Sequence, residues 1–177
     1  SGSDKHGDVF EIMFEGGAPD TELTRVVIDT DQGVKGRSVG DMIFDTVKGG
    51  WGADEAFPFQ IVSQDGIQEV TYSVEDGGTQ LVLNLKGFNA GEKLRFSIDV
   101  DEVQDYDPTI TDQQLINEGI DPIASGVEFQ GSLATGTFKA PHYFDVEGTR
   151  EFRNIYDPQF VGTHLLISSG NANGLAQ

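Results

Sequence analysis

The sequence predicts an all-β fold, a two-sheet β-sandwich with one short helix. Apolar and polar residues alternate in several short segments, and Gly, Asn and Asp mark most of the joints between them. The chain holds 23 Gly among 177 residues, and glycine favours turns over regular elements. Many short strands joined by frequent turns are typical of a sandwich or a barrel.

Two segments show the strand alternation most clearly. Leu81, Leu83 and Leu85 fall on one face of a strand expected over 80–85, and the segment 94–100 repeats the pattern. Pro58 suits an edge or the start of a strand. The remaining strands are expected over 9–14, 23–29, 42–44, 57–62, 70–74, 127–129, 132–139 and 164–168, with 127–129 and 132–139 paired as a hairpin.

The segment 109–119 instead predicts a short helix. Thr111 is a suitable cap, Gln114 follows three residues later, and Gly119 ends the segment. The sequence has no repeat of fixed period and no low-complexity tract, so we expect residues 8–177 to form one domain. Residues 1–7 are interpreted as a leader or linker.

The charge balance is strongly acidic. The chain has 30 Asp and Glu against 11 Lys and Arg, a formal net charge of −19. Such a chain repels nucleic acid and anionic membranes, and it contains no apolar run long enough to span a bilayer. Bound divalent cations are one way to neutralise clustered carboxylates. An acidic surface that only maintains solubility is the alternative, and both can hold.

The sharpest acidic cluster follows the strand at 94–100. Asp99 and Asp101 lie two residues apart and so face the same side of a strand, and Asp105 and Asp107 follow in the next loop. Calcium takes six to eight hard oxygen ligands in a flexible geometry, which suits this arrangement. A solvated acidic strand end is the alternative. An EF-hand is excluded because Gln104 occupies the sixth position from Asp99, where that loop needs Gly.

A glycine-rich loop over 49–56 is the second candidate. It matches the start of the calcium-binding nonapeptide G-G-x-G-x-D, although one copy cannot build a β-roll. Gly50 and its neighbours would let the backbone and Asp54 approach an ion closely. Trp51 is the only tryptophan and is expected either to contact a ligand or to pack over the edge of the core.

Other candidates are weaker. Asp45 and the turn at 29–31 each offer carboxylates, but an isolated acid is more often a turn residue. The three histidines have no metal-binding spacing, and 168–170 is not a nucleophile elbow. Abundant carboxylates do not single out a glycosidase pair. We therefore expect no catalytic residues and no enzyme.

Several motifs together resemble a known module. They are Ile43-Phe44-Asp45-Thr46 with the following glycine-rich loop, Phe57-Pro58-Phe59, Leu81 to Leu85, Phe88-Asn89-Ala90-Gly91-Glu92, and Leu94 to Asp101. This pattern resembles the calcium-dependent peptide-binding domain of large bacterial surface adhesins of the repeats-in-toxin (RTX) type, and also the sponge aggregation factor core. The resemblance covers roughly 9–139.

The resemblance implies an extracellular, cell-surface sandwich that binds Ca²⁺ and grips the C-terminal end of partner proteins in cell adhesion, biofilm formation and host colonisation. A bound calcium ion would contact the terminal carboxylate of the partner. By position, Asp99 and Asp101 carry over as calcium ligands, joined by Asp45 and Asp54. Asp105 and Asp107 are added from their clustering alone. The domain would be monomeric within a long adhesin.

The ligand site is expected to include Gly50, Trp51, Tyr106 and Asp121, with the segment 103–125 as its wall. A calcium-dependent carbohydrate module, using Trp51, Tyr106 or Tyr143 as an aromatic platform, is the main alternative. A purely structural adhesin spacer is the third possibility, disfavoured because this chain is longer than the roughly 100 residues of an immunoglobulin-like sandwich.

Overall fold

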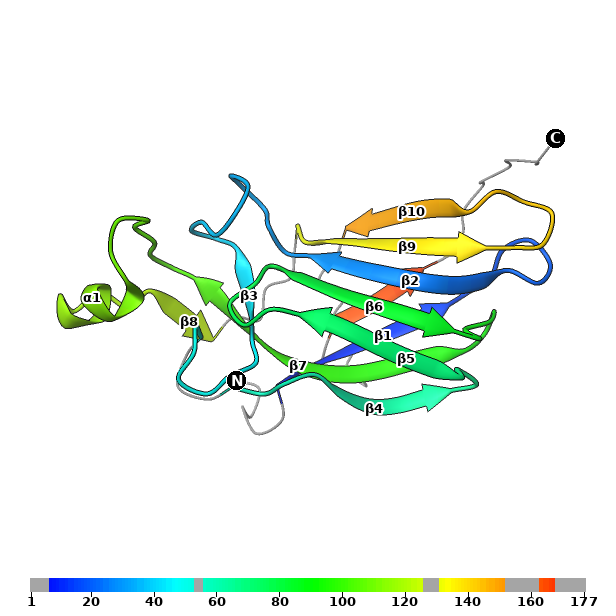
Figure 1. Cartoon of the computed structure of the whole chain (residues 1–177), viewed down its shortest axis with the longest axis horizontal. Helices are drawn as coiled ribbons and strands as arrows, with labels where there is room; N and C mark the ends of the chain where they lie inside the picture. Colours follow the sequence, from blue (N-terminus) through cyan, green and yellow to red (C-terminus); the bar gives the residue numbers. More distant parts are fainter. Residues whose placement is uncertain (1–6, 53–55, 126–130, 152–162, 168–177) are drawn as a thin grey trace.

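The computed structural model describes residues 7–52, 56–125, 131–151 and 163–167, and they form a two-layer β-sandwich (Figure 1). This architecture confirms the predicted all-β fold with one short helix. The helix among these residues is α1 (Asp112–Asn117). The strands are β1 (Asp8–Phe14), β2 (Glu22–Asp29), β3 (Met42–Asp45), β4 (Gln60–Asp65), β5 (Glu69–Val74), β6 (Gln80–Lys86), β7 (Lys93–Val103), β8 (Ile123–Ser125), β9 (Leu133–Lys139), β10 (Val146–Glu151) and β11 (Thr163–Ile167).

Strand β7 organises one of the two sheets. That sheet has the order β11-β1-β7-β3, and β4 and β8 also pair with β7. β1 and β4 flank the first half of β7, while β3 and β8 pair with its second half. The other sheet has the order β10-β9-β2-β6-β5. The pairs are antiparallel except for the parallel pair of β1 and β11.

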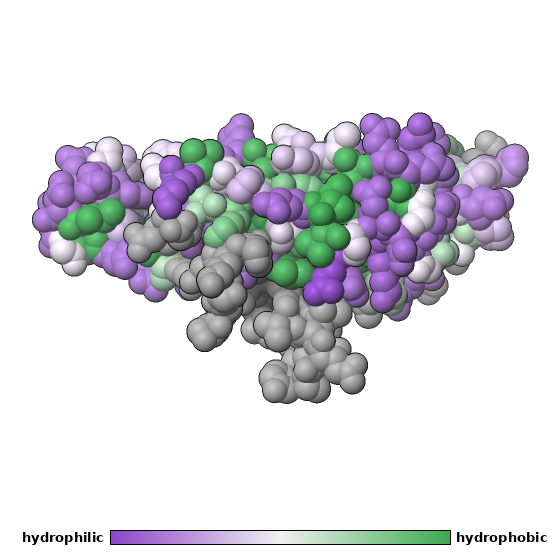
Figure 2. All heavy atoms as spheres, turned by 90° about the horizontal axis from the view of Figure 1, so that it is seen from below, coloured by the Kyte–Doolittle hydropathy of each residue, from purple (hydrophilic) through white to green (hydrophobic). Residues whose placement is uncertain are grey.

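The strands β4 and β5 run along the same side of the sandwich, at its lower margin in Figure 1. A bulge interrupts the pairing of β4 with β7 between Ile61 and Ser63. Ile61 and the neighbouring Val62 are both exposed, as is Tyr72 on β5. Seen from below, the surface is largely hydrophilic, with apolar side chains in a few separate groups (Figure 2).

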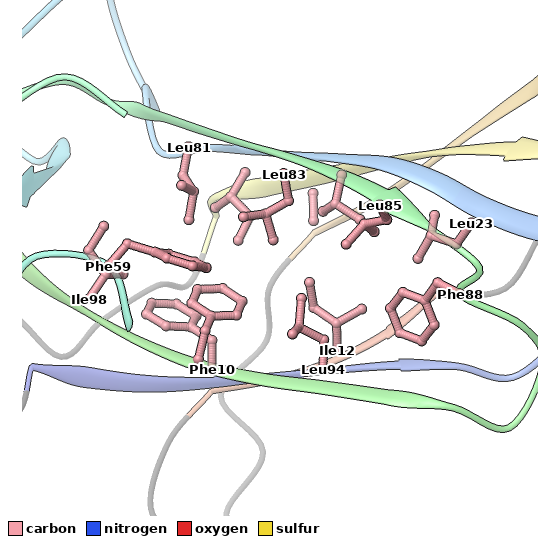
Figure 3. Packing of buried hydrophobic residues seen from close by; sticks show 14 of the residues in the cluster. Phe10, Ile12, Leu23, Phe59, Leu81, Leu83, Leu85, Phe88, Leu94 and Ile98 are labelled. Carbon is pink, nitrogen blue, oxygen red and sulfur yellow. The ribbon is translucent and has the colours of Figure 1, made fainter. Parts of the chain in front are cut away.

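The core lies between the two sheets. The predicted alternation on β6 directs Leu81, Leu83 and Leu85 inward, where they face side chains of β1 and β7 such as Ile12 and Leu94 (Figure 3). Side chains on the opposite face of β7 do not enter this core, because successive residues of a strand point to opposite faces. That outer face carries Asp99 and Asp101.

Some element bounds differ from the sequence prediction. β4 begins at Gln60 instead of residue 57, although the carbonyl of Phe57 already accepts a hydrogen bond from the Asp99 amide. β7 continues to Val103, beyond the last residue of the apolar alternation. The polar strand β10 was not predicted, and α1 occupies only the centre of the segment 109–119. The segment expected at 127–129 lies outside the described residues.

Aromatic stacking joins β1, β7 and β5 across the core. The Phe96 ring lies 5.1 Å from that of Phe10 and 5.0 Å from that of Phe59, which in turn stacks on Tyr72 at 4.3 Å. Phe96 is therefore one of the two inner rings of this four-ring column, and it is fully buried.

Replacing Phe96 by alanine is expected to lower the free energy of unfolding by about 3–5 kcal/mol, because it removes two stacking contacts and leaves a cavity. Urea denaturation followed by circular dichroism measures the change. Val62→Ala, at an exposed position of the bulge, serves as the control and is expected to cost within about 0.5 kcal/mol. Equal effects of the two substitutions would contradict the central place of Phe96 in the core.

Candidate metal and ligand site

Three carboxylates meet where β3 pairs with β7. Asp45 lies directly opposite Asp99 in the antiparallel register, and Asp101 follows on the same face of β7. Directly opposed residues of two such strands have Cβ atoms about 4.5–5.5 Å apart. The structure therefore brings together three of the acids predicted from the sequence, Asp45, Asp99 and Asp101. We call these three residues the aspartate cluster.

The glycine-rich loop covers this cluster. A side chain at Gly52 would overlap the Oδ2 atom of Asp45 and come within 2.5 Å of Oδ2 of Asp101. The loop backbone thus lies directly against both carboxylates, and any larger residue at position 52 would force these side chains to move. Asp45 and Asp101 are 1% and 2% exposed, so this burial removes two carboxylates from water.

Burial and mutual repulsion alter the proton affinity of these groups. Burial, followed by the charges of Asp101 and Asp76, raises the pKa of Asp45 from 3.8 to about 6. Burial, followed by the charges of Asp101, Asp8 and Asp45, raises the pKa of Asp99 from 3.8 to about 7. Full ionisation of the aspartate cluster is therefore opposed both by burial and by repulsion among its own charges.

The aspartate cluster fits the chemistry of a calcium ion. Oδ1 of Asp45 is buried and has no hydrogen-bond partner among the described residues, and such an oxygen is costly unless a donor or a cation satisfies it. Carboxylate oxygens are the hard ligands that Ca²⁺ prefers. Within the described ranges, no three His, Cys, Asp or Glu side chains are arranged as a formed metal-binding set. Binding would therefore require these side chains to turn toward a common ion.

Asp76 anchors the loop that covers the aspartate cluster. Its Oδ1 accepts hydrogen bonds from the amides of Thr46 and Val47 and from the Thr46 hydroxyl, and its Oδ2 accepts one from the Trp51 amide. Gly50 passes so close to Oδ2 that a side chain there would overlap it. Asp76 was not singled out from the sequence. The only local signal is the turn-forming Asp-Gly pair it makes with Gly77.

The two predicted aromatic ligand residues meet near this loop. Trp51 and Tyr106 are 50% and 38% exposed, and the guanidinium of Arg37 lies over both rings. Gly50 and Trp51 belong to the loop that covers the aspartate cluster. The structure thus places an aromatic surface next to the loop that covers the buried aspartate cluster.

The other predicted acids do not join the aspartate cluster through any interaction in the described part of the chain. Asp105 and Asp121 are exposed. Oδ1 of Asp107 accepts hydrogen bonds from the amide and hydroxyl of Thr109, which hold its pKa below the usual value. Asp107 therefore shapes the turn before α1. Asp54 lies outside the described residues.

The turn at 29–31 also uses its acids for local structure. Asp29 accepts a hydrogen bond from the Asp31 amide, and Asp31 accepts one from the Gly36 amide. The fully buried Asp41 accepts three, from the Gln32 amide and from the amide and hydroxyl of Ser38. These carboxylates organise the loop between β2 and β3.

A scan against protein-family models and searches of curated proteins and solved structures found no significant match to this chain. None of the helices in the described ranges is long and apolar enough to cross a membrane.

The metal-free protein is expected to lose stability as the pH rises from about 4 to about 7. The pKa values of Asp45 and Asp99 are raised in the folded state, so in this window the folded chain binds more protons than the unfolded chain. Unfolding midpoints measured in EDTA across this range test the prediction. Asp99→Asn should flatten the dependence, whereas Asp121→Asn, at an exposed acid, should not. If the unfolding midpoint changes with pH by the same amount in the unaltered protein and in both variants, the prediction is contradicted.

Replacing Asp76 by alanine is expected to destabilise the metal-free protein by about 2 kcal/mol, because four donors lose a charged acceptor. Fluorescence of Trp51, the only tryptophan, should report a loosened loop. Asp76→Asn keeps one acceptor oxygen and should recover part of the loss. Glu75→Gln removes the same charge from the adjacent, exposed position and is the control. If Glu75→Gln has the same effect as Asp76→Ala, the loss of charge is responsible and the anchoring role is wrong.

Proposed function

We propose that this chain is a calcium-dependent ligand-binding module of a bacterial surface adhesin, which binds the C-terminal end of partner proteins through a bound calcium ion. The observation that carries the proposal is the aspartate cluster, with its unsatisfied buried oxygen, directly beneath a glycine-rich loop that presents Trp51.

In such a site the ion would overcome the electrostatic repulsion between the chain and its ligand. A chain with a net charge of −19 repels a carboxylate. A divalent cation among Asp45, Asp99 and Asp101 would reverse the sign of the potential locally, since a bound ion is the largest charge in its surroundings. An ion coordinated by the cluster can also accept an oxygen ligand from outside, because calcium tolerates variable coordination. A terminal carboxylate is a ligand of this kind.

The exposed rings support contacts with the rest of the ligand. Trp51 and Tyr106 present apolar surface with a polar edge, a combination enriched at binding sites. The same rings also favour the second candidate, a calcium-dependent carbohydrate module, in which sugars would stack on them. The two candidates share the ion and differ in the group that it coordinates.

Short peptides with a free C-terminal carboxylate are expected to bind in calcium and not in EDTA, and the same peptides with amidated C-termini are expected not to bind. A peptide library measured by fluorescence polarisation, with an oligosaccharide panel beside it, tests this. Equal binding of free and amidated peptides would overturn the role of the carboxylate. Binding of sugars alone would favour the carbohydrate module.

The location of the ion is tested separately by thermal melts. Calcium at about 100 times its dissociation constant should stabilise the protein by about 2.7 kcal/mol. The double substitution Asp45→Asn with Asp101→Asn should abolish this shift, and Asp105→Asn should retain it. If instead Asp105→Asn abolishes the shift and the double substitution retains it, the ion binds in the loop after β7. No shift in the unaltered protein would reject a calcium site altogether.

A further inference from the structure

Arg37 brings together segments that are distant in the sequence. Its guanidinium carbon lies 4.9 Å from the centre of the Trp51 ring and 5.5 Å from the centre of the Tyr106 ring. Trp51 belongs to the loop between β3 and β4, whereas Tyr106 follows β7. A flat cation is attracted to the faces of aromatic rings at such distances. Arg37 therefore links two rings that come from different loops.

A third segment fixes the guanidinium. Nη2 of Arg37 lies 2.6 Å from Oδ2 of Asp112, the first residue of α1, and the two side chains are only 11% and 20% exposed. A short charge-assisted hydrogen bond of this kind is stronger than a bond between neutral groups. In the part of the chain that the structure describes, Nε and Nη1 of Arg37 are buried and have no hydrogen-bond partner. The two rings and Asp112 thus provide the attractive contacts that the described residues make with this guanidinium.

The segment that Asp112 belongs to projects from the sandwich. α1 extends away from the sheets at one end of the molecule (Figure 1), and apolar atoms reach the surface at that end (Figure 2). Backbone hydrogen bonds from Gln104 and Asp105 to Pro122 close the base of the segment. Ile116 and Ile120 are exposed on it. The ion pair with Arg37 therefore ties a projecting arm to the loop that covers the aspartate cluster.

We propose that Arg37 is a positioning residue that sets the spacing of the Trp51 and Tyr106 rings and holds the α1 arm beside them. The proposal rests on the proposed function, in which both rings contact the ligand. Arg37 needs no contact with the ligand in this role. Lysine cannot replace it, since an ammonium group lacks the flat face that stacks on a ring while its edge donates to a carboxylate.

The test compares Arg37→Gln, Arg37→Lys and Lys35→Gln. Lys35 is exposed on the same loop, so its substitution removes the same charge without touching the rings. Arg37→Gln is expected to weaken binding of the tightest free-carboxylate peptide roughly tenfold, Arg37→Lys by a similar factor, and Lys35→Gln by no more than about twofold. The calcium-induced shift in melting temperature should remain in all three variants, because the aspartate cluster is intact.

Quenching of Trp51 fluorescence by acrylamide provides a readout that needs no ligand. It should increase in both Arg37 variants and stay unchanged in Lys35→Gln. Unchanged quenching in Arg37→Gln would overturn the positioning role, even if no peptide binds and the proposed function fails. Unchanged peptide affinity in Arg37→Gln would also overturn it. If calcium no longer raises the melting temperature of Arg37→Gln, Arg37 affects ion binding and is not a positioning residue for the rings.

Discussion

The burial of like charges on the outer face of β7 is the constraint on which this end of the molecule depends. The inner face of that strand supplies the core, so its alternation forces the intervening residues outward. Asp99 and Asp101 occupy outward positions, and β3 adds Asp45 directly opposite Asp99. The covering loop then removes water from two of these carboxylates. Folding therefore brings like charges together and removes them from water. The raised pKa values of Asp45 and Asp99 reflect this unfavourable environment for the ionised carboxylates.

The acids of this region fall into two groups according to their hydrogen bonds. Asp41 and Asp76 accept three and four hydrogen bonds respectively from loop amides and hydroxyls, so each of their oxygens already has at least one donor. Such carboxylates organise loops. Asp45, in contrast, keeps a buried oxygen that has no hydrogen-bond partner within the described ranges. The excess of acidic residues does not distinguish these two groups, but the hydrogen bonds that each carboxylate accepts do distinguish them. By this criterion the aspartate cluster is the candidate cation site.

The sequence predicted those elements whose characteristic residues lie within a few positions of one another. The alternating leucines of β6 and the capping residues Thr111 and Gln114 required only neighbouring positions, and the structure has both features. The pairing of Asp45 with Asp99 follows from a sheet register that no short window of sequence contains. Asp76 was missed for the same reason, because its partners lie on another loop. The strand β10 was missed because its Gly and charged residues give no apolar alternation.

A single loop connects the aspartate cluster with the aromatic surface. Gly52 touches the carboxylates of Asp45 and Asp101, and the adjacent Trp51 stacks on Arg37. Gly52 follows Trp51 directly in the chain, so a displacement of the backbone at Gly52 would be transmitted to the backbone that carries the Trp51 ring. A cation that drew Asp45 and Asp101 together would therefore act on the ring as well as on the local potential. Calcium dependence of ligand binding would then have two physical origins, the charge that the ion supplies and the loop geometry that it selects.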